Sequence, residues 1–342
     1  MPTLHFRLGW TRADLVTLLS VLTVTAAVLA PVLLKRRAEA DWVKCAANLR
    51  DLGVAAHRYH EDHGRLPPGY WGPLDPQTKK TDWPLDFHAQ NVGLLPALLP
   101  YLGQEEFCKL LLFGQGEANA AYLDLDRTPP PWWTNDRLFH LAKARVPFFL
   151  CPANPDTSPK WGFHVAMHLY EPHMEVAYYP TATVGLLGRT HYLGTMGTGP
   201  SRHTFLNSCI GVFGNRSRVS LKRVAEQDVT SYTLMFGETV GGTLDPELDY
   251  ANAWMGCGAM STVDGIGRKS PNQNPKEAFD FLYWNRFGSL HERVANFCFA
   301  DGSVRGLRPA NTTVWLHPDW YILMQLTGRN DGRDDDISLI VD

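Results

Sequence analysis

An uncharged run of twenty residues near the start of the chain, from Leu15 to Leu34, constrains the fold most strongly. A helix of that length spans about 30 Å, which matches the hydrocarbon core of a bilayer. A buried core helix is one alternative, but core helices of soluble proteins normally keep a polar face. A cleaved secretory signal is another, and Ala38 to Ala40 would then serve as the cleavage site, although the basic cluster Lys35 to Arg37 lies between. We therefore expect a retained membrane span.

The residues around this span resemble the leader of a type IV prepilin. Gly9 is followed by Trp10 and Thr11, and Asp14 stands at the fifth position counted from Trp10, where pilins carry an acid. Pro31 stands at the twenty-second position, where pilin helices commonly carry a kinking proline. The resemblance implies cleavage after Gly9 by a prepilin peptidase, methylation of the Trp10 amine, and a domain outside the bacterial cytoplasmic membrane.

The charges near the span leave alternatives open. Arg7 and Arg12 precede it and the cluster Lys35 to Arg37 follows it, so counting basic residues alone favours a cytoplasmic C-terminal side. The prepilin resemblance overrides that count, although Arg12 and Ala13 replace the apolar pair usual before the acid. An unpaired carboxylate at Asp14 would cost about 2.5 to 3.5 kcal/mol in the membrane. The amine of a neighbouring subunit would offset this cost; capping at the interface is the alternative.

Helical periodicity continues beyond the basic cluster. A stripe of mainly apolar residues recurs every three or four positions: Trp42, Cys45, Leu49, Leu52, Ala56, Tyr59 and His63. Gly64 and Pro67 to Gly69 then end the helix. Residues 12–63 should form one helix of about 75 Å, kinked near Pro31. We expect an α+β, pilin-like fold, in which the second half of this helix packs on an antiparallel β-sheet with large loop insertions.

Seven segments from residue 45 onward carry a second resemblance. They are CAANLRDLGVAAHRYHEDHGRLPPG (45–69), LLPALLPYLGQ (94–104), FLCPAN (149–154), HYLGTMGTG (191–199), IGVFGNRSRV (210–219), DVTSYTLMFGE (228–238) and FGSLHERVANFCFADGSVRGL (287–307). The chain resembles the DUF1559 family of bacterial proteins, whose C-terminal part is described as a prepilin-type processing-associated H-X9-DG domain. Here the motif is His291 with Asp301-Gly302. The resemblance implies a pilin-like anchor and an exported domain, and it brings no established reaction.

The expected organisation follows from both resemblances. It comprises a leader over residues 1–9, a transmembrane helix over 10–37, and an exported domain over 38–342 in which the helix continues to 64. Residues 109–146 match the family poorly and read as a surface insertion. Pro129 to Trp133 within it is interpreted as a loop whose Trp pair packs locally, with a docking surface as the alternative.

We interpret the H-X9-DG segment as a structural motif rather than a catalytic one. Residues 294–307 predict a β-hairpin, with Phe297 and Phe299 on one face of its first strand. Asp301-Gly302 is expected to form a two-residue type I′ turn. His291, just before the strand, would hydrogen-bond the hairpin or the aspartate, because no nucleophile in a recognisable setting accompanies it.

The six cysteines form no C-x-x-C pair, so neither a zinc knuckle nor a thioredoxin-like motif is predicted. Cys45 and Cys151 both lie in segments that match the family. A disulfide between them would attach the helix to the domain and stabilise it by about 2 to 4 kcal/mol, whereas buried unpaired thiols are the alternative. Glu238 is expected to enter the interior, where an Arg or a backbone amide would compensate its charge; contact with a ligand is the alternative.

Signatures of catalysis and of metal binding are weak. The chain has no H-E-x-x-H, G-x-S-x-G or P-loop motif, so we expect no enzymatic activity and no cofactor. Spacings of three make His57, His60 and His63 poor chelators on a helix. Three acids near the end, Asp331, Asp334 and Asp336, are weak calcium candidates, and a solvated loop is the preferred interpretation. The net charge of −3 gives no indication of a nucleic-acid partner.

Two functions are compatible with these features. The first is a pilin- or pseudopilin-like subunit in the bacterial cytoplasmic membrane, single-pass, whose partners are membrane lipid, prepilin peptidase and other pilin-like subunits. The second is a membrane-tethered extracytoplasmic protein that binds a ligand such as a glycan. Assembly requires the Trp10 amine and Asp14, whereas a tethered receptor requires only the apolar span.

Overall fold

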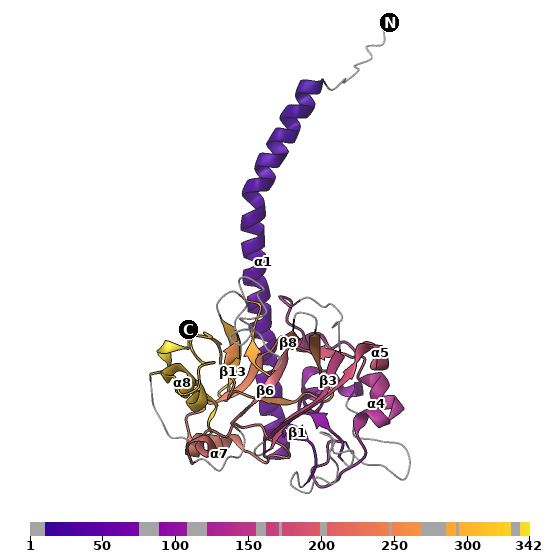
Figure 1. Cartoon of the computed structure of the whole chain (residues 1–342), viewed down its shortest axis with the longest axis vertical. Helices are drawn as coiled ribbons and strands as arrows, with labels where there is room; N and C mark the ends of the chain where they lie inside the picture. Colours follow the sequence, from indigo (N-terminus) through magenta and orange to yellow (C-terminus); the bar gives the residue numbers. More distant parts are fainter. Residues whose placement is uncertain are drawn as a thin grey trace. The chain divides into compact units, whose positions relative to one another are not determined.

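The computed structural model of the chain describes residues 11–74, 89–107, 122–154, 162–170, 173–198, 204–245, 248–267, 285–291, 294–329 and 336–342. The chain divides into two compact units, Met1–Val43 and Lys44–Asp342. Helix α1 (Arg12–His63) begins in the first unit and ends in the second (Figure 1). Its bounds are those that the sequence pattern predicts, which confirms the long N-terminal helix.

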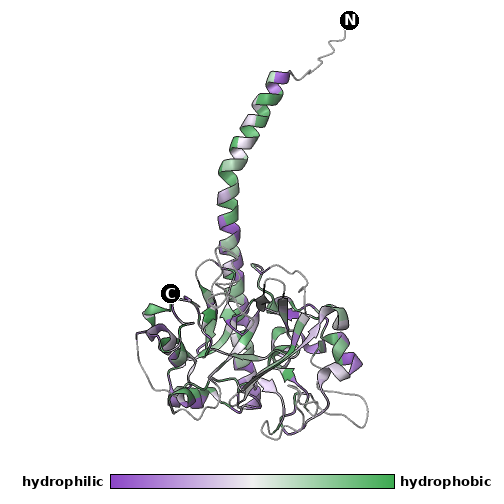
Figure 2. Cartoon of the chain, viewed as in Figure 1, coloured by the Kyte–Doolittle hydropathy of each residue, from purple (hydrophilic) through white to green (hydrophobic). Residues whose placement is uncertain are grey.

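In the first unit, α1 presents apolar side chains on all sides. Between Leu15 and Leu34 its large apolar residues are 43 to 68% exposed, and hydrophobic colouring covers most of this stretch in Figure 2. The helix continues through Pro31. Among the residues that the structure describes, α1 is the one helix long and apolar enough to cross a membrane, a test that a signal sequence also passes.

In the second unit, α1 packs against a central five-stranded sheet. The strand order is β10 (Ala259–Ser261), β6 (Tyr192–Gly197), β7 (Leu234–Glu238), β13 (Ala295–Phe299) and β14 (Val304–Leu307). Neighbouring strands are antiparallel except β10 and β6, which run parallel. The α+β class is therefore confirmed, with a mixed sheet where the sequence suggested an antiparallel one.

The two faces of β13 contribute to different hydrophobic clusters. Cys298 lies in the cluster that contains the buried residues of α1, including Cys45. Phe297 and Phe299 lie in a second cluster with α8 (Pro318–Thr327). This alternation confirms the strand pattern predicted from the sequence, and it places the central sheet between α1 and α8.

The remaining strands and short helices surround this core. A second five-stranded sheet has the order β4 (His173–Pro180), β3 (Gly162–Tyr170), β9 (Leu248–Ala253) and β5 (Arg189–Thr190), with β8 (Gly242–Asp245) also paired to β9. Two-stranded sheets join β1 (Tyr70–Trp71) to β2 (Val92–Gly93) and β11 (Ile266–Gly267) to β12 (Phe287–Gly288). The short helices are α2 (Leu95–Leu98), α4 (Asp136–Leu141), α5 (Thr181–Val184), α6 (Thr204–Ser208), α7 (Leu221–Gln227), η2 (Pro100–Leu102), η3 (Trp132–Thr134), η4 (Pro147–Phe149) and η6 (Ile337–Leu339).

The C-terminal residues run along β14, the last strand of the central sheet. Leu307 and Val341 form an antiparallel bridge. The Arg308 N–H donates to the Ile340 carbonyl at 2.7 Å, and the Asp342 N–H donates to the Gly306 carbonyl at 2.9 Å. The backbone groups on the outer side of β14 are thus partly paired within the chain.

The β13–β14 hairpin closes differently from the prediction. The Phe299 N–H donates to the Ser303 carbonyl at 2.9 Å and the Gly302 N–H to the Phe299 carbonyl at 2.9 Å, so three residues, 300–302, form the loop. Of these three, Gly302 alone has a positive φ, 82°. The expected two-residue type I′ turn is therefore wrong, because that turn needs positive φ at two positions. Asp301 Oδ1 instead accepts from the Ser303 N–H at 2.8 Å.

Residues 122–146, part of the expected insertion, contribute several buried side chains to the hydrophobic core. Trp132 is fully buried and its Nε1–H donates to the Val165 carbonyl at 3.2 Å. The neighbouring Trp133 ring meets Trp132 edge to face, at 5.6 Å between centroids. The Trp pair therefore packs inside the molecule, as the non-docking interpretation required. Residues 108–121 lie outside the described part of the chain.

We expect Gly53→Ala to destabilise the protein, although this substitution usually stabilises a helix by roughly 0.5 to 1 kcal/mol. A Cβ at Gly53 would lie 2.6 Å from Cys298 Sγ, so the free energy of unfolding should fall by about 1 to 3 kcal/mol. Urea unfolding of the full chain in detergent measures the change. Adding Cys298→Ala should recover part of the loss, and Val54→Ala at the exposed neighbouring position is the control. Strictly additive effects of the two substitutions would contradict the proposed contact.

Candidate functional site

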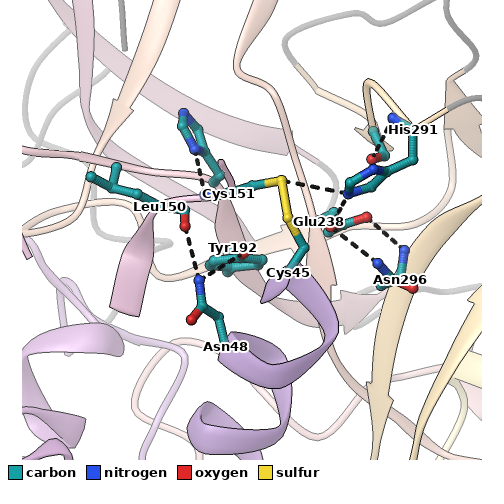
Figure 3. Close-up of a disulfide and its surroundings, with 10 residues drawn as sticks. Cys45, Asn48, Leu150, Cys151, Tyr192, Glu238, His291 and Asn296 are labelled. Carbon is teal, nitrogen blue, oxygen red and sulfur yellow. Dashed lines mark hydrogen bonds and ion pairs between the residues drawn. A yellow bond between two sulfur atoms is a disulfide. The ribbon is translucent and has the colours of Figure 1, made fainter. Parts of the chain in front are cut away.

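Helix α1 is attached to the loop after η4 by a covalent bond and a hydrogen bond. Cys45 and Cys151 form a disulfide, with 5.1 Å between their Cα atoms (Figure 3). Asn48 lies one turn further along α1, and its Nδ2–H donates to the Leu150 carbonyl at 2.9 Å. Because residues three apart share a helix face, both contacts reach the same loop. The bonded cysteines are the pair that the sequence singled out.

A buried histidine holds the loop from its other side. The Cys151 N–H donates to Nδ1 of His191, just before β6, at 2.9 Å. Burial, with a smaller contribution from Arg189, lowers the pKa of His191 to about 3. The imidazole is therefore neutral near pH 7, and Nδ1 keeps the lone pair that accepts the Cys151 amide.

Glu238 brings a carboxylate into the interior at the end of β7. Its side chain is only 3% exposed. Oε2 accepts from the Asn296 N–H at 2.7 Å and Oε1 accepts from Asn296 Nδ2–H at 3.3 Å. Asn296 is on β13, the strand next to β7, so the carboxylate takes up a backbone donor at the point where the ladder ends. The expected compensation by a backbone amide is observed, as a buried acid requires.

His291 joins this carboxylate to the disulfide. Its Nε2 atom lies 3.4 Å from Glu238 Oε1 and 3.6 Å from Cys151 Sγ, and the side chain is 7% exposed. The His291 N–H donates to Ser289 Oγ at 3.1 Å, which fixes the backbone before β13. Figure 3 shows the imidazole pointing toward both groups. The imidazole contacts the Glu238 carboxylate and the Cys151 sulfur, whereas Asp301 closes the hairpin turn.

Tyr192 completes the polar surroundings. Its hydroxyl oxygen accepts from Asn48 Nδ2–H at 3.2 Å. Burial raises the pKa of Tyr192 well above its ordinary value, and the charge of Glu238 adds to the shift. The phenol is therefore protonated across the physiological range and serves as a neutral hydrogen-bonding group.

The other predicted site residues that the structure describes are not part of this cluster. Asp14 is at the start of α1, and Asp336 Oδ1 accepts from the Ser338 N–H at 3.0 Å at the start of η6. The remaining candidates, Gly9, Trp10, Asp331 and Asp334, lie outside the described residues. His57 Nε2 bonds with the Ala300 carbonyl at 2.9 Å, and His63 Nδ1 with the Tyr59 carbonyl at 3.0 Å.

Sequence reasoning missed several members of the site. His191 and Tyr192 lie in HYLGTMGTG, a segment noticed only for its resemblance and its glycines. Asn48 lies in the predicted helix without any assigned role. The available signal was that each of these polar residues occurs beside buried apolar residues, where a polar group requires a partner.

We expect removal of the disulfide to destabilise the domain. The bond closes a separation of 106 residues, so replacing both cysteines with Ala should lower the free energy of unfolding by about 2 to 4 kcal/mol. Urea unfolding of the full chain in detergent with a metal chelator gives the value. A dithiol reductant should weaken the wild-type chain and leave the Cys45→Ala/Cys151→Ala variant unchanged. Equal unfolding midpoints for all four samples would contradict the disulfide.

We also expect stability to fall in acid because of His191. Folding lowers its pKa from 6.5 to about 3, so below pH 6.5 the unfolded chain gains a proton that the folded chain does not. The contribution is lost as the pH falls from about 6.5 toward 3, at roughly 1.4 kcal/mol per pH unit. His191→Asn keeps an acceptor for the Cys151 amide and removes this titration. Between pH 3 and 6.5, the slope of its unfolding free energy against pH should correspond to about one proton fewer than in the wild type. An unchanged slope would contradict the assignment.

Comparison with known proteins places the chain in one family. A family model described as a protein of unknown function, DUF1559, matches residues 36–311. That range contains every residue of the cluster at the disulfide. Neither a curated protein nor a solved structure matches the chain. The match covers most of the sequence, and the chain belongs to the DUF1559 family of proteins of unknown function.

Proposed function

We propose that the chain is a membrane-anchored, non-enzymatic subunit of pilin or pseudopilin type, with its domain outside the cytoplasmic membrane. The observation that carries the proposal is α1, a 52-residue helix whose first part exposes apolar side chains and whose last part packs one face against the domain. The apolar helix and the disulfide together indicate a membrane anchor or signal with an extracytoplasmic domain, because disulfides persist in oxidising compartments.

The exposed apolar surface of α1 requires a partner. A monomeric protein in water rarely exposes such a continuous apolar surface. Lipid covers it in a single anchored chain, and the same surface of other copies would cover it in an assembly. This supports lateral packing of helices as the mode of association.

Asp14 caps the start of α1, the local role that the sequence left as an alternative, and this role is compatible with a part in assembly. Its Oδ2 accepts from the Thr11 N–H at 2.9 Å and from Thr11 Oγ1–H at 2.7 Å, while the Asp14 N–H donates to Thr11 Oγ1 at 3.2 Å. This capping arrangement satisfies hydrogen bonds at the helix start. These hydrogen bonds bring no positive charge to the Asp14 carboxylate, so the Trp10 amine of a neighbouring subunit would still be a favourable partner in the membrane.

The chemistry at the disulfide supports a structural role. The sulfurs of Cys45 and Cys151 are bonded to each other, and the side chains of Glu238 and His291 are 3% and 7% exposed. A dissolved substrate has little access to these groups. The arrangement suits a rigid junction between α1 and the sheet.

A membrane-tethered binding protein is the second candidate. A pocket of about 620 Å³ favours it, lined by Glu106, Phe107, Arg137, His140, Leu141, Lys143 and Ala144 around α4. The lining combines apolar side chains with charged ones, a combination found in ligand sites. A glycan or another small molecule would be the ligand in that case.

We expect Asp14→Ala to abolish assembly and leave insertion intact, because the change removes the charge that would pair with a neighbouring amine. Cross-linking and co-purification of differently tagged copies from membranes measure assembly. In the wild-type protein, N-terminal analysis should find a methylated Trp10 as the first residue. Glu39→Gln, an exposed change on the same helix, is the control. Unaltered co-purification of Asp14→Ala would contradict the pilin role and favour a tethered receptor.

A further inference from the structure

We propose that the reduced form of this chain binds one Zn²⁺ ion between Cys45, Cys151, Glu238 and His291. One ligand atom from each residue lies within 4.8 Å of every other. These are two sulfurs, a carboxylate oxygen and an imidazole nitrogen, a mixed set that suits zinc. The disulfide and the metal are alternative ways of joining the same two cysteines.

Two of the distances between ligand atoms already suit a tetrahedral site. Zinc binds sulfur at about 2.3 Å and nitrogen or oxygen at about 2.0 to 2.2 Å, which separates neighbouring ligand atoms by roughly 3.3 to 3.8 Å. His291 Nε2 is 3.4 Å from Glu238 Oε1 and 3.6 Å from Cys151 Sγ. The two sulfurs, now bonded to each other, must also separate once their bond is broken.

The groups around the cluster orient its ligands. Glu238 Oε2 accepts from the Asn296 N–H at 2.7 Å, which leaves Oε1 directed at the imidazole (Figure 3). The Cys151 N–H is held by His191, and the His291 N–H by Ser289. Such outer contacts fix ligand orientation in metal sites. Four protein ligands in a buried position give a closed, structural site rather than a catalytic one.

Charge also favours a metal in the reduced form. Without the disulfide, the cluster contains a buried carboxylate and two thiols. Zn²⁺ bound to two thiolates and the carboxylate leaves a net charge of −1, with the positive ion in contact with each anion. The ion thus compensates the buried acid directly.

The chemistry balances in both directions. A dithiol reductant breaks the S–S bond, supplies two electrons and two protons, and becomes a disulfide; Zn²⁺ then binds while both thiols release their protons to water. In the reverse direction, a disulfide oxidant accepts two electrons from the thiolates and two protons from water, its own S–S bond breaks to give two thiols, the Cys45–Cys151 bond forms, and Zn²⁺ leaves. A newly made chain whose cysteines have not been oxidised can bind the ion without a reductant.

The test uses the full chain in detergent, produced under reducing conditions and purified without oxygen. Titration with Zn²⁺ against a competing chelator should show one ion per reduced chain, and the oxidised chain should bind none at the same free Zn²⁺. Co²⁺ in place of Zn²⁺ should give the charge-transfer absorption of a thiolate complex. In the reduced chain, alkylation followed by mass spectrometry should be slower at Cys45 and Cys151 with Zn²⁺ than without it.

Variants separate this site from other thiols. His291→Gln and Glu238→Gln should each weaken Zn²⁺ binding by at least roughly 10- to 100-fold, the range seen even for outer contacts. Cys257→Ser is the matched control: this buried thiol donates to the His164 carbonyl at 3.1 Å, a bond that Ser can keep. Its Zn²⁺ affinity should equal that of the wild type.

Two results would overturn the proposal. One is a folded, reduced wild-type chain that binds no stoichiometric Zn²⁺. The other is equal Zn²⁺ binding by the wild type and by a Cys45→Ser/Cys151→Ser variant. If a ligand variant fails to fold, the alkylation pattern of the wild type decides, because unprotected Cys45 and Cys151 in zinc-loaded chain contradict the site. None of these results depends on whether the chain assembles in the membrane.

Discussion

The attachment of α1 to the central sheet is the constraint on which the rest of the structure depends. The helix is held near one end of its buried part by the Cys45–Cys151 bond and three turns later by the hydrogen bond from His57 to the Ala300 carbonyl. A stiff helix fixed at two separated points can neither slide nor rotate against the sheet. Gly53, between these points, lets the helix approach β13 closely enough for contact with Cys298. The alignment of every buried residue of α1 follows from these few contacts.

A buried acid next to that attachment makes it electrostatically demanding. Glu238 is held by donors from Asn296, and His291 lies between it and the disulfide. A carboxylate in such a place tolerates little loss of its partners, because leaving it unpaired costs far more than a surface charge would. For the same reason, reducing the disulfide would change the surroundings of the Glu238 carboxylate and of the His291 imidazole. Covalent and electrostatic stabilisation are thus joined in one small region where α1, β7 and the loop before β13 meet.

Local patterns predicted local structure well. The bounds of α1 followed from its spacing of apolar residues and from the Gly and Pro residues after it, since both act within a few positions. The alternation of β13 followed from Phe297 and Phe299 for the same reason. The hairpin loop was harder, because a change of one residue in strand pairing converts a two-residue loop into a three-residue one.

Features that depend on distant pairings could not be predicted. The sequence did not show that β10 would run parallel to β6, nor that residues 122–146 would bury Trp132. The cluster at the disulfide draws its members from α1, β6, β7 and the residues before β13, so its geometry exists only once the sheet order is set. Family resemblance pointed to Cys45, Cys151 and His291 separately, whereas their convergence with Glu238 required the fold.

The pairing of the C-terminal residues with β14 has a consequence for association. An open edge strand invites another chain to extend the sheet, and natural proteins cover such edges to prevent it. Here the bridge between Leu307 and Val341 occupies part of that edge with the chain's own backbone. Growth of a continuous sheet from copy to copy is therefore disfavoured on this side of the central sheet.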